Sequence, residues 1–339
     1  MNALITGGAG FIGANLTHRL VSEGHRVLVY DNLSRLGAEK NLAWLHAQCG
    51  DRWTLIRADV RDSEALHRAA AGAEVIYHLA SQVAVTTSVQ DPRLDFEVNA
   101  LGTFNVLEAA RLSGQRPIVI YASTNKVYGG MEDVAVVEGE TGYSYRDYPY
   151  GISEDYPLDF HSPYGCSKGA GDQYVRDYAR IYGLPTVVLR QSCIYGPRQF
   201  GVEDQGWVAW FLIAAVTGQA ITIYGDGKQV RDLLWVDDLL DLYEAAVQQI
   251  DVAAGQVYNV GGGPESTLAV WQELGPLLTV LMGRQVPVTY DDWRPGDQPI
   301  FVADIRKAEQ ELGWRPRITR EEGVRRLYEW VVDHRDLFT

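Results

Sequence analysis

The sequence has few cysteines, no long apolar run and no excess of positive charge. Its three cysteines, Cys49, Cys166 and Cys193, stand far apart in a chain of 339 residues. They fit neither a disulfide framework nor a zinc site, and none of the seven histidines has metal-ligand spacing. No apolar run approaches the ~18 residues of a membrane span, and residues 1–5 lack the features of a signal peptide. We expect a metal-free protein of the cytoplasm, with no membrane partner.

The charge balance is acidic. Thirty Lys and Arg against 44 Asp and Glu give a formal net charge of −14. The long-range field repels nucleic acids and anionic membranes, so neither is an expected partner. Any anionic ligand must be held by a local group of cations. The length exceeds the ~250–300 residues at which a single core usually stops growing, which predicts two lobes.

Short β-branched runs alternate with amphipathic segments in the first half of the chain. Strands are expected at 3–5, 26–30, 54–56, 74–77, 117–121 and 186–190. Helical patterns lie between them, most clearly at 104–112 and 164–182. Nearly continuous apolar strands that alternate with helices predict an α/β fold with a doubly wound parallel sheet, the Rossmann fold.

The pattern changes twice along the chain. Residues 124–160 are rich in Gly, Tyr, Pro and acids, which predicts a long active-site loop. We therefore divide the chain into a Rossmann domain at 1–195 and a smaller α+β lobe at 196–330. A segment at about 235–248 is a candidate for return to the first domain.

A glycine-rich turn joins the first predicted strand to the first helix. Gly7, Gly10 and Gly13 stand three residues apart, with Phe11 and Ile12 between the last two. Glycines here allow a tight turn and a close approach of the backbone to a pyrophosphate, whose charge meets the N–H groups at the helix start. Such turns are common on their own. The position of this one, between strand and helix, favours a dinucleotide site.

An acid at the end of the second strand supports this interpretation. Asp31 follows the turn by about 20 residues, where a carboxylate accepts hydrogen bonds from the adenosine ribose. It would repel a 2′-phosphate, which favours NAD over NADP, although the nearby Arg35 leaves NADP open. Asp59 and Val60, after the third strand, either contact adenine or lie at an exposed helix cap.

A tyrosine, a lysine and a hydroxyl form the candidate catalytic set. Tyr164 and Lys168 are four residues apart in a helical pattern, so both project from one face. An ammonium there stabilises a phenolate and lowers the pKa of the tyrosine from ~10. Such a base takes a proton from a sugar hydroxyl while hydride leaves the same carbon. Ser123 and Thr124 follow a strand at the edge of the sheet that binds ligands, where either hydroxyl can share the proton.

These features together resemble the extended short-chain dehydrogenase/reductase family, which contains the nucleotide-sugar epimerases and dehydratases. The likeness covers nearly the whole chain and includes His78-Leu79-Ala80, Asn99-x-x-Gly102-Thr103, Val127-Tyr128-Gly129 and Val230-Arg231-Asp232. It implies that 1–195 binds NAD and that 196–330 binds a nucleotide sugar. It also implies that Thr124, Tyr164 and Lys168 are the catalytic residues.

The resemblance extends to the binding residues. The expected cofactor contacts are Gly7, Gly10, Phe11, Ile12, Gly13, Asp31, Asn32, Asp59, Val60, Leu79, Ala80, Asn99, Tyr164 and Lys168. The expected substrate contacts are Ser81, Gln82, Thr124, Asn125, Lys126, Arg198, Arg231 and Arg294. The resemblance implies that Arg231 and Arg294 bind the substrate diphosphate, and guanidinium groups are suited to this because they bind phosphate oxygens in a bidentate way. A surface ion pair is the alternative for each.

Within the family, the chain is most similar to 2-epimerases of CDP-hexoses. Asn125 and Lys126 stand where the dehydratases of the family carry an Asp and a Glu, and an amide and an ammonium cannot supply both acid and base for loss of water. The resemblance implies transient oxidation at C2 of the sugar and return of hydride to the opposite face. A UDP-hexose 4-epimerase, a 2-epimerase of CDP-glucose or GDP-glucose, and a non-catalytic NAD sensor are the alternatives. By analogy with the family, helices at about 91–112 and 161–182 would pair two subunits, giving a homodimer or homotetramer.

Overall fold

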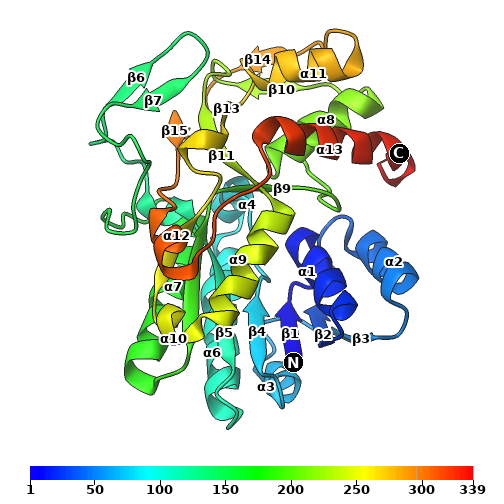
Figure 1. Cartoon of the computed structure of the whole chain (residues 1–339), viewed down its shortest axis with the longest axis vertical. Coiled ribbons are helices and arrows are strands. Elements are labelled where there is room, and N and C mark those ends of the chain that lie inside the picture. The colour runs from blue at the N-terminus through cyan, green and yellow to red at the C-terminus, as the bar shows by residue number, and fades with distance from the viewer. Residues whose placement is uncertain (295, 339) are drawn as a thin grey trace.

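A computed structural model describes residues 1–294 and 296–338 of the chain. Figure 1 shows a large α/β layer, which contains the N-terminus, and a smaller group of strands and helices above it. The last helix, α13 (Arg320–Asp333), belongs to the smaller group and ends close to the C-terminus.

Seven strands form the central sheet, in the order β12-β8-β5-β4-β1-β2-β3. They are β1 (Asn2–Thr6), β2 (Arg26–Asp31), β3 (Trp53–Arg57), β4 (Val75–His78), β5 (Ile118–Thr124), β8 (Thr186–Gln191) and β12 (Val257–Val260). Every neighbouring pair is parallel. The predicted doubly wound parallel sheet is confirmed. The strand order reverses between β1 and β4, and such sheets bind ligands at the carboxyl ends of the strands beside that point.

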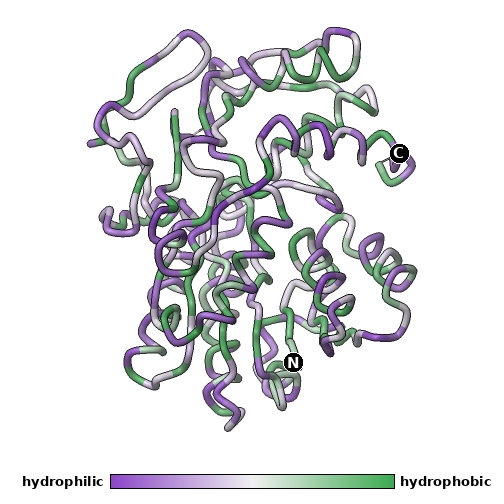
Figure 2. Tube along the Cα trace, in the orientation of Figure 1, coloured by the Kyte–Doolittle hydropathy of each residue, from purple (hydrophilic) through white to green (hydrophobic). Residues whose placement is uncertain are grey.

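Helices cover both faces of the sheet. Side chains of successive strand residues point to opposite faces, so Ala3 and Ile5 join one core and Leu4 joins the other. The first core includes residues of α1 (Phe11–Ser22), α2 (Ala38–Cys49), α9 (Val236–Gln248), α10 (Ile250–Ala253) and α12 (Arg306–Leu312). The second includes residues of α3 (Ser63–Ala70), α6 (Gly102–Leu112) and α7 (Ser162–Tyr182). Figure 2 shows the central strands as largely hydrophobic, as burial on both faces requires.

Two short helices and a wide turn lead into α6. They are α4 (Val85–Gln90), α5 (Pro92–Phe96) and the π-helical turn η1 (Glu97–Leu101). After β5 comes a single 3-10 turn, η2 (Asn125–Tyr128), and then the small antiparallel hairpin of β6 (Val136–Glu138) and β7 (Tyr143–Tyr145). No other helix or strand lies between 124 and 161 in the structure, so most of this segment is the irregular loop that its composition indicates.

The smaller lobe is built from short strands and three main helices. One sheet contains β9 (Cys193–Tyr195), β11 (Val230–Trp235), β13 (Thr267–Ala269) and β15 (Ile300–Phe301), and a second pairs β10 (Thr222–Tyr224) with β14 (Thr289–Asp291). Helices α8 (Trp207–Thr217), α11 (Leu274–Met282) and α13 supply its core. Two 3-10 turns, η3 (Pro264–Ser266) and η4 (Arg335–Leu337), complete it.

More of the second half returns to the first lobe than the sequence division assigns to it. Helix α9 packs on α1 at the predicted return. In addition, β12 adds an edge strand to the main sheet and α12 packs against it. The four-residue apolar run of β12 is too short to be distinguished from other strands of the second lobe by its pattern alone. Its pairing with β8 is a tertiary contact.

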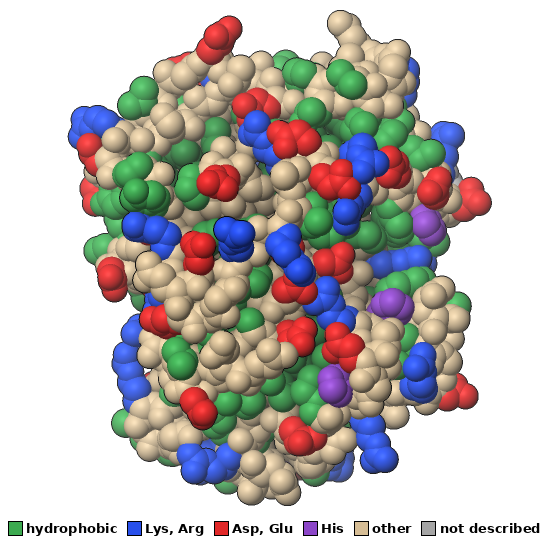
Figure 3. All heavy atoms as spheres, viewed as in Figure 1, with side chains coloured by type: hydrophobic (Ala, Val, Ile, Leu, Met, Phe, Trp, Pro, Cys, Tyr) green, Lys and Arg blue, Asp and Glu red, His purple; other side chains and the backbone are tan. Residues whose placement is uncertain are grey.

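Charged side chains of both signs lie on the surface. On the face shown in Figure 3, Lys and Arg are interspersed with Asp and Glu. None of the helices in 1–294 and 296–338 has both the length and the hydropathy of a membrane-spanning helix. The same residues contain no group of three or more potential metal ligands.

Candidate active site

The glycine turn brings the backbone of β1 against the loop that follows β4. Gly7 has φ +72°, and a Cβ there would lie 2.7 Å from the backbone nitrogen of Ala80. A Cβ on Gly13 would lie 2.2 Å from the carbonyl oxygen of Gly7. Gly10 begins α1 without a side-chain cap, so the first N–H groups of the helix face the cavity beside it. The turn therefore has the close approach and the free N–H groups that a dinucleotide diphosphate requires.

The carboxylate of Asp31 lies beside this turn, buried at the end of β2. Its oxygens accept hydrogen bonds from the backbone N–H groups of Ala9 at 3.0 Å and Leu33 at 2.7 Å. Burial nevertheless raises the pKa of Asp31 above its usual value. Two predicted neighbours, Asn32 and Asp59, are joined by a hydrogen bond of 2.8 Å. The guanidinium of Arg61 helps to lower the pKa of Asp59 to about 2.

A single cavity of about 670 Å³ runs along the carboxyl ends of the strands. It extends from the glycine turn and Asp31 at one end to Thr124, Tyr164 and Lys168 at the other. The predicted residues that line it are Gly7, Gly10, Phe11, Ile12, Gly13, Asp31, Asn32, Asp59, Val60, Leu79, Ala80, Ser81, Gln82, Thr124, Tyr164, Lys168 and Arg198. The cavity is elongated and joins the two sets of residues, as an extended dinucleotide requires.

Tyr164 and Lys168 lie on consecutive turns of α7, and both are buried. The ammonium of Lys168 donates a hydrogen bond of 2.6 Å to the carbonyl oxygen of Ala122. Burial lowers the pKa of Lys168 to about 7, although Asp172 and Asp95 oppose this change. Their carboxylates therefore help to keep the amine protonated.

The expected effect of Lys168 on Tyr164 is absent from this structure. Burial raises the pKa of the Tyr164 phenol to about 12, and a hydrogen bond with Thr124 only partly offsets it. The prediction of a lowered pKa is therefore wrong for the protein alone. The physical reason is that burial removes water from the phenolate, while the Lys168 ammonium is directed to the Ala122 carbonyl.

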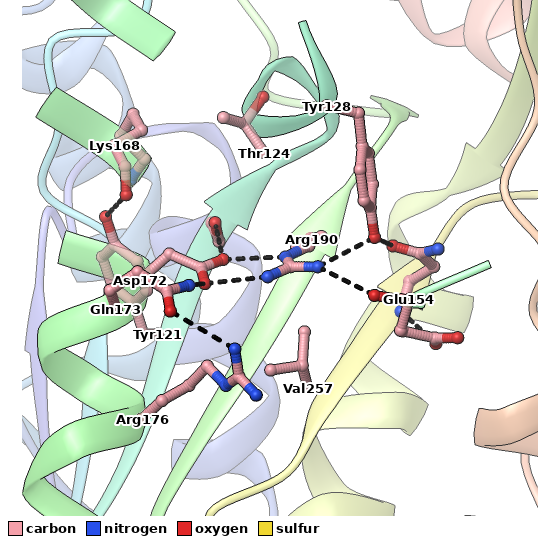
Figure 4. A network of polar contacts seen from close by, with 12 residues as sticks. Tyr121, Thr124, Tyr128, Glu154, Lys168, Asp172, Gln173, Arg176, Arg190 and Val257 are labelled. Carbon is pink, nitrogen blue, oxygen red and sulfur yellow. Dashed lines mark hydrogen bonds and ion pairs between the residues drawn. The ribbon is translucent and has the colours of Figure 1, made fainter. Parts of the chain in front are cut away.

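A buried ion pair lies next to the end of the cavity that carries Tyr164 and Lys168. Arg190 of β8 donates to both carboxylate oxygens of Asp172 in α7, at 2.9 and 3.0 Å. Ser123, next to the candidate catalytic Thr124, donates to the same carboxylate at 2.8 Å. Arg190 also donates to the hydroxyl of Tyr128 at 3.0 Å. Figure 4 shows this network lying between α7 and Tyr128, with Lys168 and Thr124 above it. The network connects α7, which carries Tyr164, to β8 and to β5, which carries Thr124.

Asn99 does not line the cavity, contrary to the prediction of a cofactor contact. Its amide donates to the Gln82 carbonyl at 3.0 Å and to the buried Asp95 carboxylate at 3.1 Å. Its oxygen accepts from Ser81 and from the backbone of Gln82. The wide turn of η1 directs the side chain inward. Asn99 therefore positions the loop 81–82, which does line the cavity.

The remaining predicted substrate residues lie outside the cavity lining. Arg231 donates to the Asp297 carboxylate at 2.7 Å and to the Gln298 carbonyl at 2.8 Å. Arg294 forms an ion pair of 3.1 Å with Asp204. Both arginines therefore form ion pairs: the Arg231 side chain is largely buried, at 10% exposure, whereas that of Arg294 is 28% exposed.

Asn125 and Lys126 are on the turn η2, directly after Thr124. Burial and the neighbouring Arg231 lower the pKa of Lys126 to about 8. Asp297 also acts on the charge of Lys126, so this lysine and Arg231 share one acidic neighbour.

The chain matches a family model described as GDP-mannose 4,6 dehydratase over residues 4–327. The chain belongs to this family. It is thus a member of the extended short-chain dehydrogenases/reductases, as its motifs predict. It is 44% identical over 338 residues to a CDP-paratose 2-epimerase of Salmonella typhi, covering 98% of this chain and 99% of that protein. It is 35% identical to a UDP-glucose 4-epimerase of Mycolicibacterium smegmatis, covering 97% and 98%.

Solved structures of the family have the same fold. A dTDP-glucose 4,6-dehydratase of Streptomyces venezuelae, solved with NAD bound, superposes with a TM-score of 0.84 at 29% identity, covering 99% of this chain and 98% of that chain. A UDP-glucose 4-epimerase of Thermus thermophilus in complex with NAD has a TM-score of 0.80 at 32% identity, covering 97% and 98%. These enzymes carry out different reactions on one fold, so the reaction of this family member must be argued from its own residues.

The sequence analysis missed one wall of the cavity in this family member. Gln191, the last residue of β8, pairs with Thr124 and lines the cavity together with the next two residues, Ser192 and Cys193. Phe200 and Gln205 line it farther along, in the segment before α8. The rule that ligands bind at the carboxyl ends of strands points to 191–193, because β8 ends there. No comparable signal exists for Phe200 and Gln205, which reach the cavity through a loop.

Proposed function

We propose that this protein is an NAD-dependent nucleotide-sugar epimerase that inverts C2 of a CDP-hexose. The observation that carries the proposal is the placement of Thr124, Tyr164 and Lys168 at one end of a cavity whose other end has the glycine turn and Asp31. The 44% identity to a CDP-paratose 2-epimerase supports the choice of reaction. Asp31 supports NAD over NADP because its carboxylate would repel a 2′-phosphate.

Each residue of the catalytic set has a separate role in this reaction. Tyr164 is the base that removes the proton from the C2 hydroxyl, and Thr124 holds that hydroxyl by sharing its hydrogen bond. Lys168 supplies positive charge next to the phenol and is kept in place by the Ala122 carbonyl. When bound, NAD⁺ would accept the C2 hydride and return it, and its positive charge would favour the phenolate. Phe11, Ile12 and Gly13 would hold its diphosphate with their backbone N–H groups.

Transient oxidation explains how an unactivated carbon is inverted. A sugar C–H bond is too weak an acid for direct proton exchange, whereas removal of hydride makes C2 planar. Rotation of the 2-keto sugar then exposes its other face, and Tyr164 returns the proton to the new alcohol. No carboxylate occupies positions 125 and 126 to remove a proton from a neighbouring carbon. This supports epimerisation over loss of water.

Product analysis tests the proposal. The purified protein is incubated with CDP-paratose, CDP-glucose, GDP-glucose and UDP-glucose, and the sugar products are followed by NMR. We expect inversion at C2 of a CDP-hexose, with no net change in NAD. Inversion at C4 of UDP-glucose with C2 unchanged would show that the second candidate, a 4-epimerase, is correct. The 35% identity to a UDP-glucose 4-epimerase is the reason to keep a 4-epimerase as the second candidate.

We further propose that two copies of the chain pair through α6 and α7. Several large apolar side chains on these two helices, on η1 and at the end of α5 are exposed. They are Phe96, Leu101, Phe104, Leu112, Tyr174, Ile181 and Tyr182. The rings of Phe104 and Tyr174 are in contact across the two helices, at 6.1 Å between centroids. Exposed apolar side chains on two neighbouring helices favour a partner with the same surface.

The assembly can be tested with one charged substitution. Phe104→Glu is expected to convert a homodimer or homotetramer into smaller species, because it buries a carboxylate in the apolar contact. Light scattering after size-exclusion chromatography measures the mass. Val280→Glu is the matched control, since Val280 is 80% exposed on α11, away from this face. An unchanged mass for Phe104→Glu would exclude this interface.

A further inference from the structure

Arg198 is a buried cation with no acidic partner. It is 7% exposed and lines the cavity, and its side-chain nitrogens form no hydrogen bond or ion pair with any residue of 1–294 or 296–338. Taking a positive charge out of water is unfavourable unless an anion compensates it. The other cations on the cavity wall have polar partners: Arg61 pairs with Asp59, Lys168 binds the Ala122 carbonyl and Arg35 donates to Gln205. Arg198 is therefore poised for a ligand anion.

Two tryptophans fix the position of this cation. The Arg198 guanidinium lies over the ring of Trp44 in α2, 4.6 Å from its centroid, and over that of Trp330 in α13 at 5.4 Å. The residue also has φ +67°, a conformation that costs energy for a residue other than glycine. The two rings thus hold the guanidinium of a residue that lines the cavity and has a strained backbone conformation.

The backbone of Arg198 is tied to the glycine turn and to α1. The Asn41 amide donates to the carbonyl oxygens of both Ala9, at 3.1 Å, and Arg198, at 3.4 Å. The Asn15 amide donates to the carbonyls of Phe11 and of Pro197, the residue before Arg198. These bonds place Arg198 beside the start of α1.

Segment 330–338 packs around the residues next to Arg198. Phe338 packs on Trp330 at 5.7 Å and on Phe200 at 5.5 Å between ring centroids. Lys40 of α2 lies over the Phe200 ring and donates to the carbonyl oxygen of Leu337. Phe200 itself lines the cavity. The segment 330–338 therefore covers the part of the chain that carries Arg198.

We propose that Arg198 binds the diphosphate of the dinucleotide opposite the N–H groups of α1, and that segment 330–338 holds it there and slows loss of the dinucleotide. This inference rests on the proposed function, and it replaces the expectation that Arg198 contacts the substrate. The acidic net charge of the chain makes such a local cation necessary. A fork of N–H donors suits a diphosphate better than a single ammonium does.

Exchange of the bound cofactor tests this role without measuring turnover. The NAD content of the purified protein is determined by mass spectrometry, and its replacement by isotope-labelled NAD is followed over time. Arg198→Met, which keeps an apolar stem between the tryptophans, is expected to exchange at least 10-fold faster than the wild type. Trp330→Leu keeps the Arg198 charge but removes one of the two rings that hold the guanidinium, so a smaller increase in the exchange rate is expected. Arg284→Gln, an exposed arginine of the second lobe, is the matched control.

A second measurement distinguishes the two diphosphates. Calorimetric titration with CDP is expected to give the same affinity for wild type and Arg198→Met. Weaker CDP binding with unchanged NAD exchange would overturn the proposal in favour of a substrate contact. Unchanged NAD exchange in both variants would show that Arg198 only packs between α2 and α13, and would also overturn the proposal. If Arg198→Met does not fold, as judged by circular dichroism, the Trp330→Leu result decides. A wild-type protein that holds and takes up no NAD would instead refute the proposed function.

Discussion

Replacing Tyr164 with Phe is expected to lower kcat for epimerisation by about 10²–10⁴-fold, the usual contribution of a positioned acid or base. The phenol hydroxyl is the group that takes the proton from the sugar, and Phe cannot replace it. Tyr164 is buried, and Phe differs from it only by that hydroxyl, so the fold and the bound NAD should be retained. The measurement is the rate of appearance of the inverted sugar by NMR, at saturating substrate.

The same helix supplies a control for this prediction. Tyr174 lies on α7, is 51% exposed and does not line the cavity. Tyr174→Phe should leave kcat unchanged. Because burial raises the pKa of Tyr164 to about 12, the basic form increases as pH rises below that value. The wild-type rate should therefore rise with pH, and Tyr164→Phe should lose this dependence. Full turnover by Tyr164→Phe in a verified assay would refute the mechanism.

Removal of the Asp172 carboxylate is expected to destabilise the protein by about 3–5 kcal/mol, the usual loss when one partner of a buried ion pair is deleted. Arg190 and Asp172 are almost inaccessible to solvent, at 2% and 0% side-chain exposure. In Asp172→Ala, the Arg190 guanidinium remains buried without its anion, and Ser123 loses its acceptor. The free energy of unfolding is measured by urea denaturation, followed by circular dichroism.

Asp177→Ala is the matched control, because Asp177 is exposed on the same helix. It should change the free energy of unfolding by less than about 0.5 kcal/mol, as surface substitutions usually do. The double variant Asp172→Leu/Arg190→Met removes both charges and should be more stable than Asp172→Ala. Equal stability of Asp172→Ala and wild type would show that water or another anion compensates Arg190.

The catalytic end of the cavity shows what pattern and chemistry can predict. Tyr164 and Lys168 share a helix, so their spacing alone places them on one face. Thr124 was predicted beside them because the carboxyl ends of parallel strands meet at one edge. The pKa of Tyr164 was predicted wrongly, since spacing carries no information about burial. The side chain of Asn99 is equally instructive: its motif is present, but the π-helical turn directs it to Asp95.

The second lobe was less predictable, because its elements are short and its contacts join distant parts of the chain. The predicted diphosphate arginines differ in their surroundings, and only the structure reveals that Arg231 is buried beside Asp297 whereas Arg294 pairs with Asp204. The guanidinium of Arg198 lies over the rings of Trp44 and Trp330, which are 154 and 132 residues away from it in sequence.

By itself, the order of residues determined the parallel sheet, the glycine turn, the acid after β2 and the tyrosine–lysine pair. Each depends on neighbours within a turn or on the period of a strand or helix, which are local properties of a polypeptide. Only the tertiary structure decided which charges are buried, which have partners and which face the cavity. Those outcomes depend on solvent exclusion and on contacts between segments far apart in the chain, and no local pattern encodes them.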